Sequence, residues 1–214
     1  MCVSLTEATT ERTFISHIGV EGDLSAEDLA RVVPQADDYV YVSGYSLLLE
    51  GKAQALLDWL LGLPREITVV FDPGPLVKAP DSALMAALLP RIDIWTSNGP
   101  EALAFTGAKT LADALLDLNR HLPKEALLVV RDGPNGCWVS RAGRAEHVPG
   151  FKVKAVDSNG AGDAHAGVFI AGLAAGLKPA EAARRANAAA ALAVTQWGPA
   201  TSPGTEEVDA LLTQ

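Results

Sequence analysis

Short apolar segments alternate with helical patterns through the middle of the chain, and this alternation limits the folds it can adopt. The apolar segments are nearly continuous, which is typical of strands buried on both faces. The segments between them place apolar residues at i, i+3, i+4 and i+7, which predicts helices. A β-α-β-α order predicts a parallel sheet covered by helices on both faces. The predicted strands are 39–43, 67–71, 92–96 and 127–130, and the predicted helices are 53–61, 82–89 and 111–122, with a short helix after Pro100.

Polar residues stand where these strands end. Ser43 and Gly44 close the first predicted strand, Asp72 follows the second, Asn98 the third and Arg131 the fourth. The carboxyl ends of parallel strands meet at one edge of a sheet, and ligands bind in the crevice outside that edge. We therefore expect these residues to line one site.

The sequence DSNGAGD at residues 157–163 joins a glycine turn to the start of a helical pattern. Gly160, Ala161 and Gly162 leave three backbone N–H groups unobstructed at the helix N-terminus, which suits a phosphate oxygen. We expect a positive φ at Gly162, which a β-branched residue would resist. Asp163 follows in the first turn, and a general base beside a transferring phosphoryl group would explain a carboxylate there. The alternative is an aspartate that caps a helix after a glycine turn.

The pattern changes beyond residue 131. Residues 137–140 and 145–148 predict a hairpin, and two helices rich in alanine and glycine are expected over 163–177 and 179–196. Their small residues predict close packing of the two helices.

The four histidines show no metal-ligand spacing, and we expect His165 to be partly exposed on its helix. No repeat, low-complexity tract or linker interrupts the chain, so a single domain over 1–214 is predicted.

Charge, cysteine content and missing motifs argue against several classes of protein. A net charge of −9 without any Lys/Arg-rich run argues against a nucleic-acid partner. Two cysteines cannot form a disulfide framework or a cysteine-based zinc site. The sequence shows neither a signal-peptide pattern nor a segment long enough for a membrane span, so a cytoplasmic location is expected. It also contains no P-loop, and no G-x-G-x-x-G opens a helix after the first strand, as a dinucleotide-binding oxidoreductase would require.

Three motifs together resemble those of the ribokinase-like (PfkB) family of carbohydrate kinases. The DSNGAGD sequence is similar to that family's D-T-x-G-A-G-D signature, with Ser158 in place of threonine. Residues 98–101 match its N-x-x-E motif, and residues 185–198 resemble its C-terminal helix and adenine-side loop. The resemblance begins near residue 10 and reaches the C-terminus. It implies a ribokinase-like three-layer α/β/α fold with a mostly parallel sheet, and ATP- and Mg²⁺-dependent phosphorylation of a sugar or nucleoside hydroxyl.

The resemblance also implies roles for individual residues. Asp163 would accept the proton of the sugar hydroxyl, and the backbone of Gly160, Ala161 and Gly162 would hold the γ-phosphate. The nucleotide side would comprise Asn98, Glu101, Arg131, Gly133, Gly136 and Asn187, with Glu101 also serving Mg²⁺. Each nucleotide element has a structural alternative, because an N-x-x-E pair can cap a helix, two glycines can open a hairpin, and a buried asparagine can bond a neighbouring carbonyl.

A monovalent cation of K⁺ size beside the glycine turn is a further implication of the resemblance. Asp157 would supply the only formal charge to this site. The other ligands would be oxygens of Asn159, Ala193, Gln196, Gly198 and Ser202.

The chain departs from the family pattern in two places. Residues 72–75 read DPGP where the family has D-x-N-x-R, which removes an asparagine and an arginine from the nucleotide side. Residues 11–19 alternate like a strand with one solvent-facing side, and they match the return strand of the family's β lid almost at the start of this chain. We therefore expect residues 10–20 to be a lid remnant, with the N-terminal strands, the Gly-Gly sugar-binding motif and a substrate-binding aspartate missing.

That departure sets expectations for activity and assembly. The chain by itself is expected to bind ATP–Mg²⁺ weakly and to show no sugar kinase activity. Uncovered sheet edge and apolar surface favour self-association, as in a homodimer, or binding to a partner segment. A non-catalytic nucleotide-binding remnant or subunit is the alternative function.

Overall fold

The central feature of the molecule is a six-stranded sheet whose strands lie in sequence order, β3-β4-β5-β6-β7-β8. The structure is a computed structural model that describes residues 2–6, 12–17, 19, 24–48, 52–74 and 82–213. Strands β3 to β6 are parallel, and β7 and β8 extend the sheet as antiparallel strands. The predicted parallel sheet and the predicted hairpin are both confirmed. The bounds are β3 Tyr39–Ser43, β4 Thr68–Asp72, β5 Ile94–Asn98, β6 Leu127–Arg131, β7 Gly136–Arg141 and β8 Arg144–Pro149.

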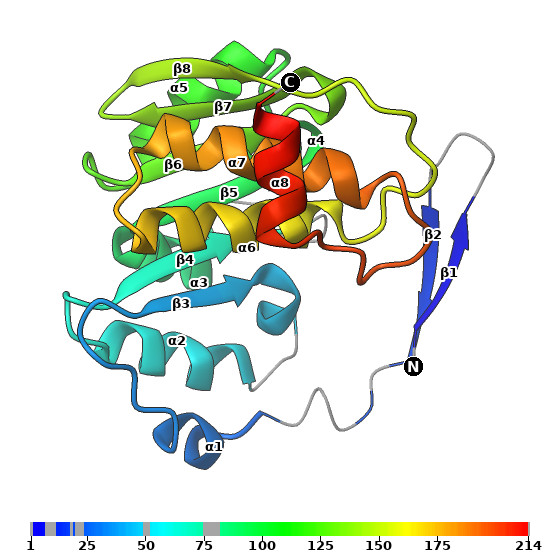
Figure 1. The fold of residues 1–214 in the computed structure, drawn as a ribbon. Helices are drawn as coiled ribbons and strands as arrows, with labels where there is room; N and C mark the ends of the chain where they lie inside the picture. Colours follow the sequence, from blue (N-terminus) through cyan, green and yellow to red (C-terminus); the bar gives the residue numbers. More distant parts are fainter. Residues whose placement is uncertain are drawn as a thin grey trace.

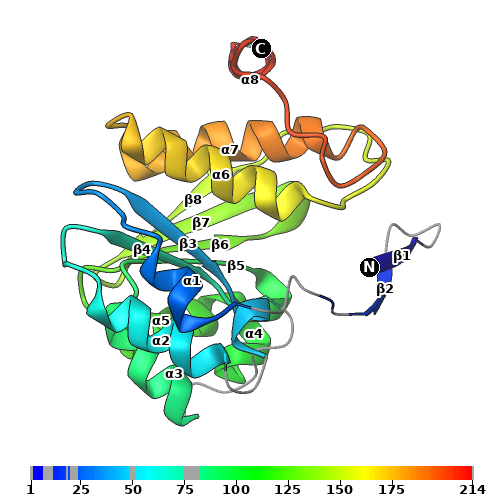
Figure 2. The ribbon, with the colours of Figure 1, turned by 90° about the horizontal axis from the view of Figure 1, so that it is seen from below.

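Helices cover both faces of this sheet and give the expected three layers (Figures 1 and 2). Because consecutive parallel strands are neighbours and crossovers are right-handed, all crossover helices lie on one face. This face carries α2 Lys52–Gly62, α3 Ala83–Leu88, α4 Gly99–Thr106 and α5 Leu111–His121, with α1 Ala26–Ala30 beside α2. The other face carries α6 Ala161–Ala174 and α7 Pro179–Ala193, with α8 Thr205–Leu212 outside them. Short 3₁₀ helices occupy Gly44–Leu47, Leu89–Arg91 and Gly133–Asn135.

Two apolar cores, one on each side of the sheet, hold the layers together. Trp95, Phe71 and Phe105 are fully buried on the crossover side, and Phe169 of α6 is fully buried on the other side. Burying each such side chain contributes roughly 1.5–3 kcal/mol. Helices α6 and α7 approach closely, because a Cβ added to Gly172 would lie 3.0 Å from the Cβ of Ala182. The predicted close packing of these two helices is confirmed.

The N-terminal segment forms a separate two-stranded antiparallel sheet, β1 Cys2–Thr6 and β2 Arg12–Ser16. It stands beside the main body in both views (Figures 1 and 2). β2 falls within the strand expected over 11–19. Glu11 and Ile18 of that expected strand, and Pro75 of the DPGP sequence, lie outside the described residues. The adjacent residues Phe14 and Ile15 point to opposite faces of β2 and both are exposed. The expected division of this strand into a solvent-facing side and a covered side is therefore not seen here. Within the described part of the chain, no helix has the length and apolar character to cross a membrane.

Candidate active site at the carboxyl edge of the sheet

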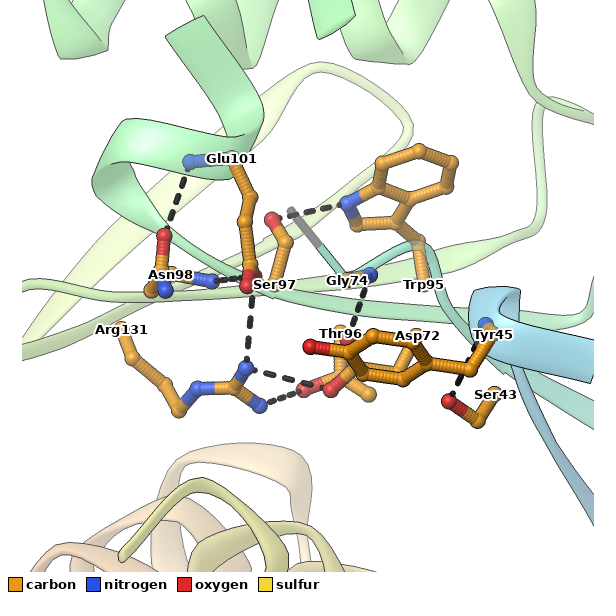
Figure 3. Close-up of polar contacts among 10 residues, drawn as sticks. All are labelled: Ser43, Tyr45, Asp72, Gly74, Trp95, Thr96, Ser97, Asn98, Glu101 and Arg131. Atoms are coloured by element: carbon orange, nitrogen blue, oxygen red, sulfur yellow. Dashed lines mark hydrogen bonds and ion pairs between the residues drawn. The ribbon is translucent and has the colours of Figure 1, made fainter. Parts of the chain in front are cut away.

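Arg131 ends β6, the last of the four parallel strands, and its side chain extends along their carboxyl edge toward β4 (Figure 3). Its Nη2 lies 3.1 Å from Asp72 Oδ2 and 3.7 Å from Glu101 Oε2, and its Nη1 donates to Thr96 Oγ1 at 2.7 Å. The side chains of Arg131, Asp72 and Glu101 are each almost nine-tenths buried. The structure therefore brings together the residues predicted at the ends of β4, β5 and β6. Thr96 was not predicted, although it lies two residues before Asn98 on the same face of β5.

Local hydrogen bonds set the positions of the two carboxylates. Asn98 caps α4: its Oδ1 accepts from the backbone N–H of Glu101 at 2.8 Å, and its own N–H donates to Glu101 Oε2 at 2.8 Å. This capping box matches the structural alternative for the N-x-x-E motif and still directs Glu101 toward Arg131. Asp72 Oδ1 accepts from the backbone N–H of Gly74 at 3.1 Å. Burial raises the pKa of Glu101, while its bonds to Asn98 and the nearby Arg131 oppose that rise.

The glycine turn starts α6 directly beside Arg131. Gly160 is the N-cap with φ 76°, and α6 begins at Ala161. A Cβ added to Gly162 would lie 3.6 Å from Arg131 Nη2, so the guanidinium borders the first turn of the helix. The expectation of positive φ at Gly162 is wrong: the left-handed residue is Gly160, because the chain turns there before the helix begins. Of the first-turn N–H groups, that of Ala161 donates to Ser158 O at 3.3 Å.

Asp163 is exposed in the first turn of α6. Among the described residues no hydrogen bond or ion pair holds its carboxylate, unlike those of Asp72 and Glu101. Tyr41 of β3 is an unpredicted neighbour of this group. Partial burial raises the pKa of Tyr41, and the negative charges of Asp72 and Asp163 add to the rise.

The glycines of the predicted nucleotide turn begin the β6–β7 connection. Gly133 starts a 3₁₀ turn and Gly136 starts β7, which pairs with β6 as an antiparallel hairpin. This matches the structural alternative of a hairpin entry. The turn nevertheless lies next to the candidate site, because it directly follows Arg131, the last residue of β6.

The loop after α7 packs on the other side of the glycine turn. Asp157 is 5% exposed, its Oδ1 accepts from the N–H of Asn159 at 2.9 Å, and its Oδ2 accepts from the N–H of Gly198 at 3.0 Å. Ala193 is buried at the end of α7, whereas Gln196 and Ser202 are exposed. The carbonyl of Pro199 lies directly against Gly160. Within the described residues, no group of three or more His, Cys, Asp or Glu side chains is placed to hold a metal ion.

Asn187 and His165 form a buried polar pair between α6 and α7. The side-chain amide of Asn187 donates to Val148 O at 3.0 Å and Pro149 O at 3.2 Å, which is the carbonyl bonding foreseen as its alternative role. Its Oδ1 faces His165 Nε2 at 3.1 Å, which assigns the proton to Nε2. The expectation of a partly exposed His165 is wrong, because the side chain is 2% exposed where α6 packs on α7. Burial, with nearby Arg131 adding, lowers the pKa of His165 to about 3.

The buried imidazole makes stability depend on pH. Its pKa in the folded state is below the value of about 6.5 in an unfolded chain, so stability is retained above pH 6.5 and lost as pH falls toward the folded value. Between pH 7.5 and pH 5 the loss from this group is about 2 kcal/mol. Urea unfolding of His165→Gln should lack this part of the pH dependence. His147→Gln, at an exposed imidazole, is the control, and an identical pH dependence in wild type and His165→Gln would contradict the assignment.

Comparison with known proteins identifies the family. The model of the pfkB family of carbohydrate kinases matches residues 1–206, and the chain belongs to this family. The uncharacterised sugar kinase YegV of Escherichia coli K12 is 32% identical over 209 residues, which cover 97% of this chain and 64% of YegV. Ribokinase of Haemophilus influenzae is 34% identical over 145 residues, 66% of this chain and 45% of that protein. The chain thus spans less than two thirds of the length of these two relatives.

Solved structures place the fold among ribokinases. Ribokinase of Thermotoga maritima matches with a TM-score of 0.79 and 26% identity, over 100% of this chain and 69% of that one. Fructokinase of Vibrio cholerae, solved with fructose, ADP and calcium, matches with a TM-score of 0.82 and 22% identity, over 99% and 73% of the two chains. The ribokinase-like α/β fold expected from the sequence is confirmed.

Proposed function

We propose that this chain binds ATP with Mg²⁺ and transfers the γ-phosphoryl group to a hydroxyl group of a sugar or nucleoside. The observation that carries the proposal is the placement of Arg131, which is fixed by Asp72 and Glu101 and borders Gly162 at the start of α6. Asp163 is exposed in the same helical turn. A cation, a helix N-terminus and an open carboxylate are the groups that hydroxyl phosphorylation needs.

In the proposed reaction each group acts on a different part of the substrates. The helix N-terminus at Gly160, Ala161 and Gly162 binds γ-phosphate oxygens, and Arg131 offsets the charge that develops on them. Asp163 orients the acceptor hydroxyl and takes its proton. Because the transition state of phosphoryl transfer is loose, the proton leaves late, and orientation matters more than the basicity of Asp163.

The charge of the site explains why the nucleotide would need a divalent cation. The carboxylates of Asp72 and Glu101 already pair with the guanidinium of Arg131, and Asp163 adds a third negative charge in the first turn of α6, so polyphosphate binding requires added positive charge. Mg²⁺ prefers carboxylate oxygens and retains several waters, so one or two carboxylates suffice to hold it. The carboxylate of Glu101 and the side-chain oxygen of Asn98 fit this role, because both are hard oxygen donors at the carboxyl edge of the sheet. When bound, Mg²⁺ would neutralise negative charge on the phosphates.

The nucleotide and acceptor classes come from the family and its relatives. Gly133 and Gly136 belong to the β6–β7 connection, which is the proposed nucleotide turn. The side-chain amide of Asn187 already donates to a backbone carbonyl, so any contact with an adenine edge would be made in addition to that bond. Aminoimidazole riboside kinase of Salmonella enterica was solved with its riboside and an ATP analogue, and its fold matches with a TM-score of 0.80. These likenesses support a nucleotide and a sugar-like acceptor as the substrate classes.

Titration calorimetry tests the proposal on the 214-residue protein. We expect a saturable isotherm for a non-hydrolysable ATP analogue with Mg²⁺ and a much weaker one without it. Arg131→Met should weaken the affinity by about 10–100-fold, since a charge-assisted contact to phosphate is lost. Arg131→Lys should lose less, and Arg144→Met, at an exposed arginine of β8, should bind like wild type.

The transfer step is tested separately by ADP release with a panel of hexoses, pentoses and ribosides. Sugar-dependent release supports transfer to a hydroxyl. Binding without sugar-dependent release supports the alternative of a nucleotide-binding subunit. Equal affinity in wild type and Arg131→Met would contradict the placement of the phosphates.

A further inference from the structure

The predicted K⁺ ligands at the end of α7 are already engaged by protein donors. The carbonyl oxygen of Ala193 accepts from the N–H of Gln196 at 3.2 Å and from Thr201 Oγ1 at 3.0 Å. A carbonyl oxygen has two lone pairs, so these two donors use both. Thr201 Oγ1 also lies 3.4 Å from the carbonyl oxygen of Gly198. One hydroxyl therefore lies beside two carbonyls that were predicted to bind the ion.

The only charged ligand of the predicted site is also compensated by the backbone. Both carboxylate oxygens of Asp157 accept backbone N–H groups, one from Asn159 and one from Gly198. Such bonds stabilise a buried carboxylate without a cation. The oxygens that remain, those of Asn159, Gln196 and Ser202, carry no formal charge, and the last two belong to exposed residues.

These bonds join the loop after α7 to the glycine turn. The N–H groups of Val156 and Asp157 donate to Val194 O at 2.7 and 3.2 Å, and the carbonyl of Pro199 lies against Gly160. Backbone N–H donors thus make the connection that an ion would otherwise make, and the Thr201 hydroxyl holds the loop against the end of α7. The donor set as it stands does not fit a K⁺ site.

We propose that the Thr201 hydroxyl, with the N–H groups of Asn159 and Gly198, takes the place of the monovalent cation in this chain. The glycine turn is then held in place without K⁺, and stability and nucleotide binding do not depend on that ion. Only the nucleotide part of this inference rests on the proposed function.

Thermal unfolding of the 214-residue protein in KCl, NaCl and choline chloride at equal ionic strength tests the inference without any nucleotide. We expect the three Tm values to agree within about 1 °C. A K⁺ site filled at 100 times its Kd would raise the Tm by about 5–10 °C. A rise of that size in KCl alone would overturn the inference.

Substitution of the hydroxyl gives an independent readout. Thr201→Val keeps the shape of the side chain and should lower the Tm by about 2–4 °C in every salt, while Thr201→Ser should restore it. Thr195→Val is the matched control, because the hydroxyl of that exposed threonine donates to Leu192 O at 2.7 Å, and this carbonyl is not one of the predicted ligands. It should show the wild-type lack of salt response. A Thr201→Val protein with the wild-type Tm would count against the hydroxyl, and if this variant does not fold, the wild-type salt series and Thr201→Ser decide.

Nucleotide affinity extends the test to the site itself. The Kd of the ATP analogue with Mg²⁺ should agree within about twofold between KCl and choline chloride. Binding that is about tenfold tighter in KCl would overturn the inference. Absence of binding in every salt would contradict the proposed function, and the thermal series then decides the inference by itself.

Discussion

In a protein that joins this chain to the family's sugar-binding segment, replacement of Asp163 by asparagine is expected to lower sugar-dependent ADP formation by about 10²–10⁴-fold. The carboxylate is exposed at the third position of α6, beside the helix N-terminus proposed to hold the phosphoryl group. Asparagine keeps the shape and the polarity but cannot take the hydroxyl proton. ATP–Mg²⁺ affinity should not fall, because the substitution removes a negative charge from an anion site. Initial rates and calorimetric Kd values measure the two effects.

Asp113→Asn is the matched control for this experiment. Asp113 occupies the same third position in α5, after the N-cap Thr110, at a helix start outside the candidate site. It should keep the wild-type rate and lose only a small part of the helix capping. Residual activity of Asp163→Asn within about tenfold of wild type would exclude Asp163 as base or hydroxyl orienter. An equal loss in both variants would point to helix stability instead.

The strands of the sheet were predictable because their burial is visible in the sequence. The predicted strand 39–43 coincides with β3, and the other three predicted parallel strands differ from β4, β5 and β6 by one or two residues. The convergence of Asp72, Glu101 and Arg131 on one edge follows from the same order, because parallel strands share a carboxyl edge. Their individual contacts were not predictable. They depend on the register that pairs Asn98 with Arg131 and on the rotamers of long side chains.

Segments with weak patterns were missed or misplaced. β1, α1 and α8 are each eight residues or shorter, and their apolar residues are too few to set a period. In α6 almost every side chain is small or apolar, so the sequence does not indicate which face packs on α7. The burial of His165, which was expected to be partly exposed, could not be predicted from such a pattern. The hydroxyl of Thr201 was also missed, since nothing in the order of residues shows that it returns to the end of α7.

Gly160→Ala should remove both the local fold and the proposed phosphate site. Gly160 has φ 76°, and a Cβ there would overlap the backbone carbonyl of Pro199. The left-handed conformation alone costs a non-glycine residue roughly 1–2 kcal/mol, and the overlap forces the glycine turn away from the loop after α7. The Tm should fall by at least about 4 °C, and binding of the ATP analogue should be lost.

Gly162→Ala separates this effect from a general sensitivity of the turn. Gly162 already has helical backbone angles, and its added Cβ would meet Arg131 Nη2 at an ordinary contact distance of 3.6 Å. Its Tm should therefore equal or slightly exceed the wild-type value, since alanine favours a helix over glycine. If this variant keeps its Tm but binds the ATP analogue more weakly, the loss shows that the added Cβ hinders the close approach of a phosphate and does not disturb the fold. Thermal unfolding followed by circular dichroism, with calorimetry on both variants, measures these differences. If Gly160→Ala kept both the wild-type Tm and the wild-type affinity, then neither the left-handed cap nor its contact with Pro199 would be needed to form an anion site at the start of α6.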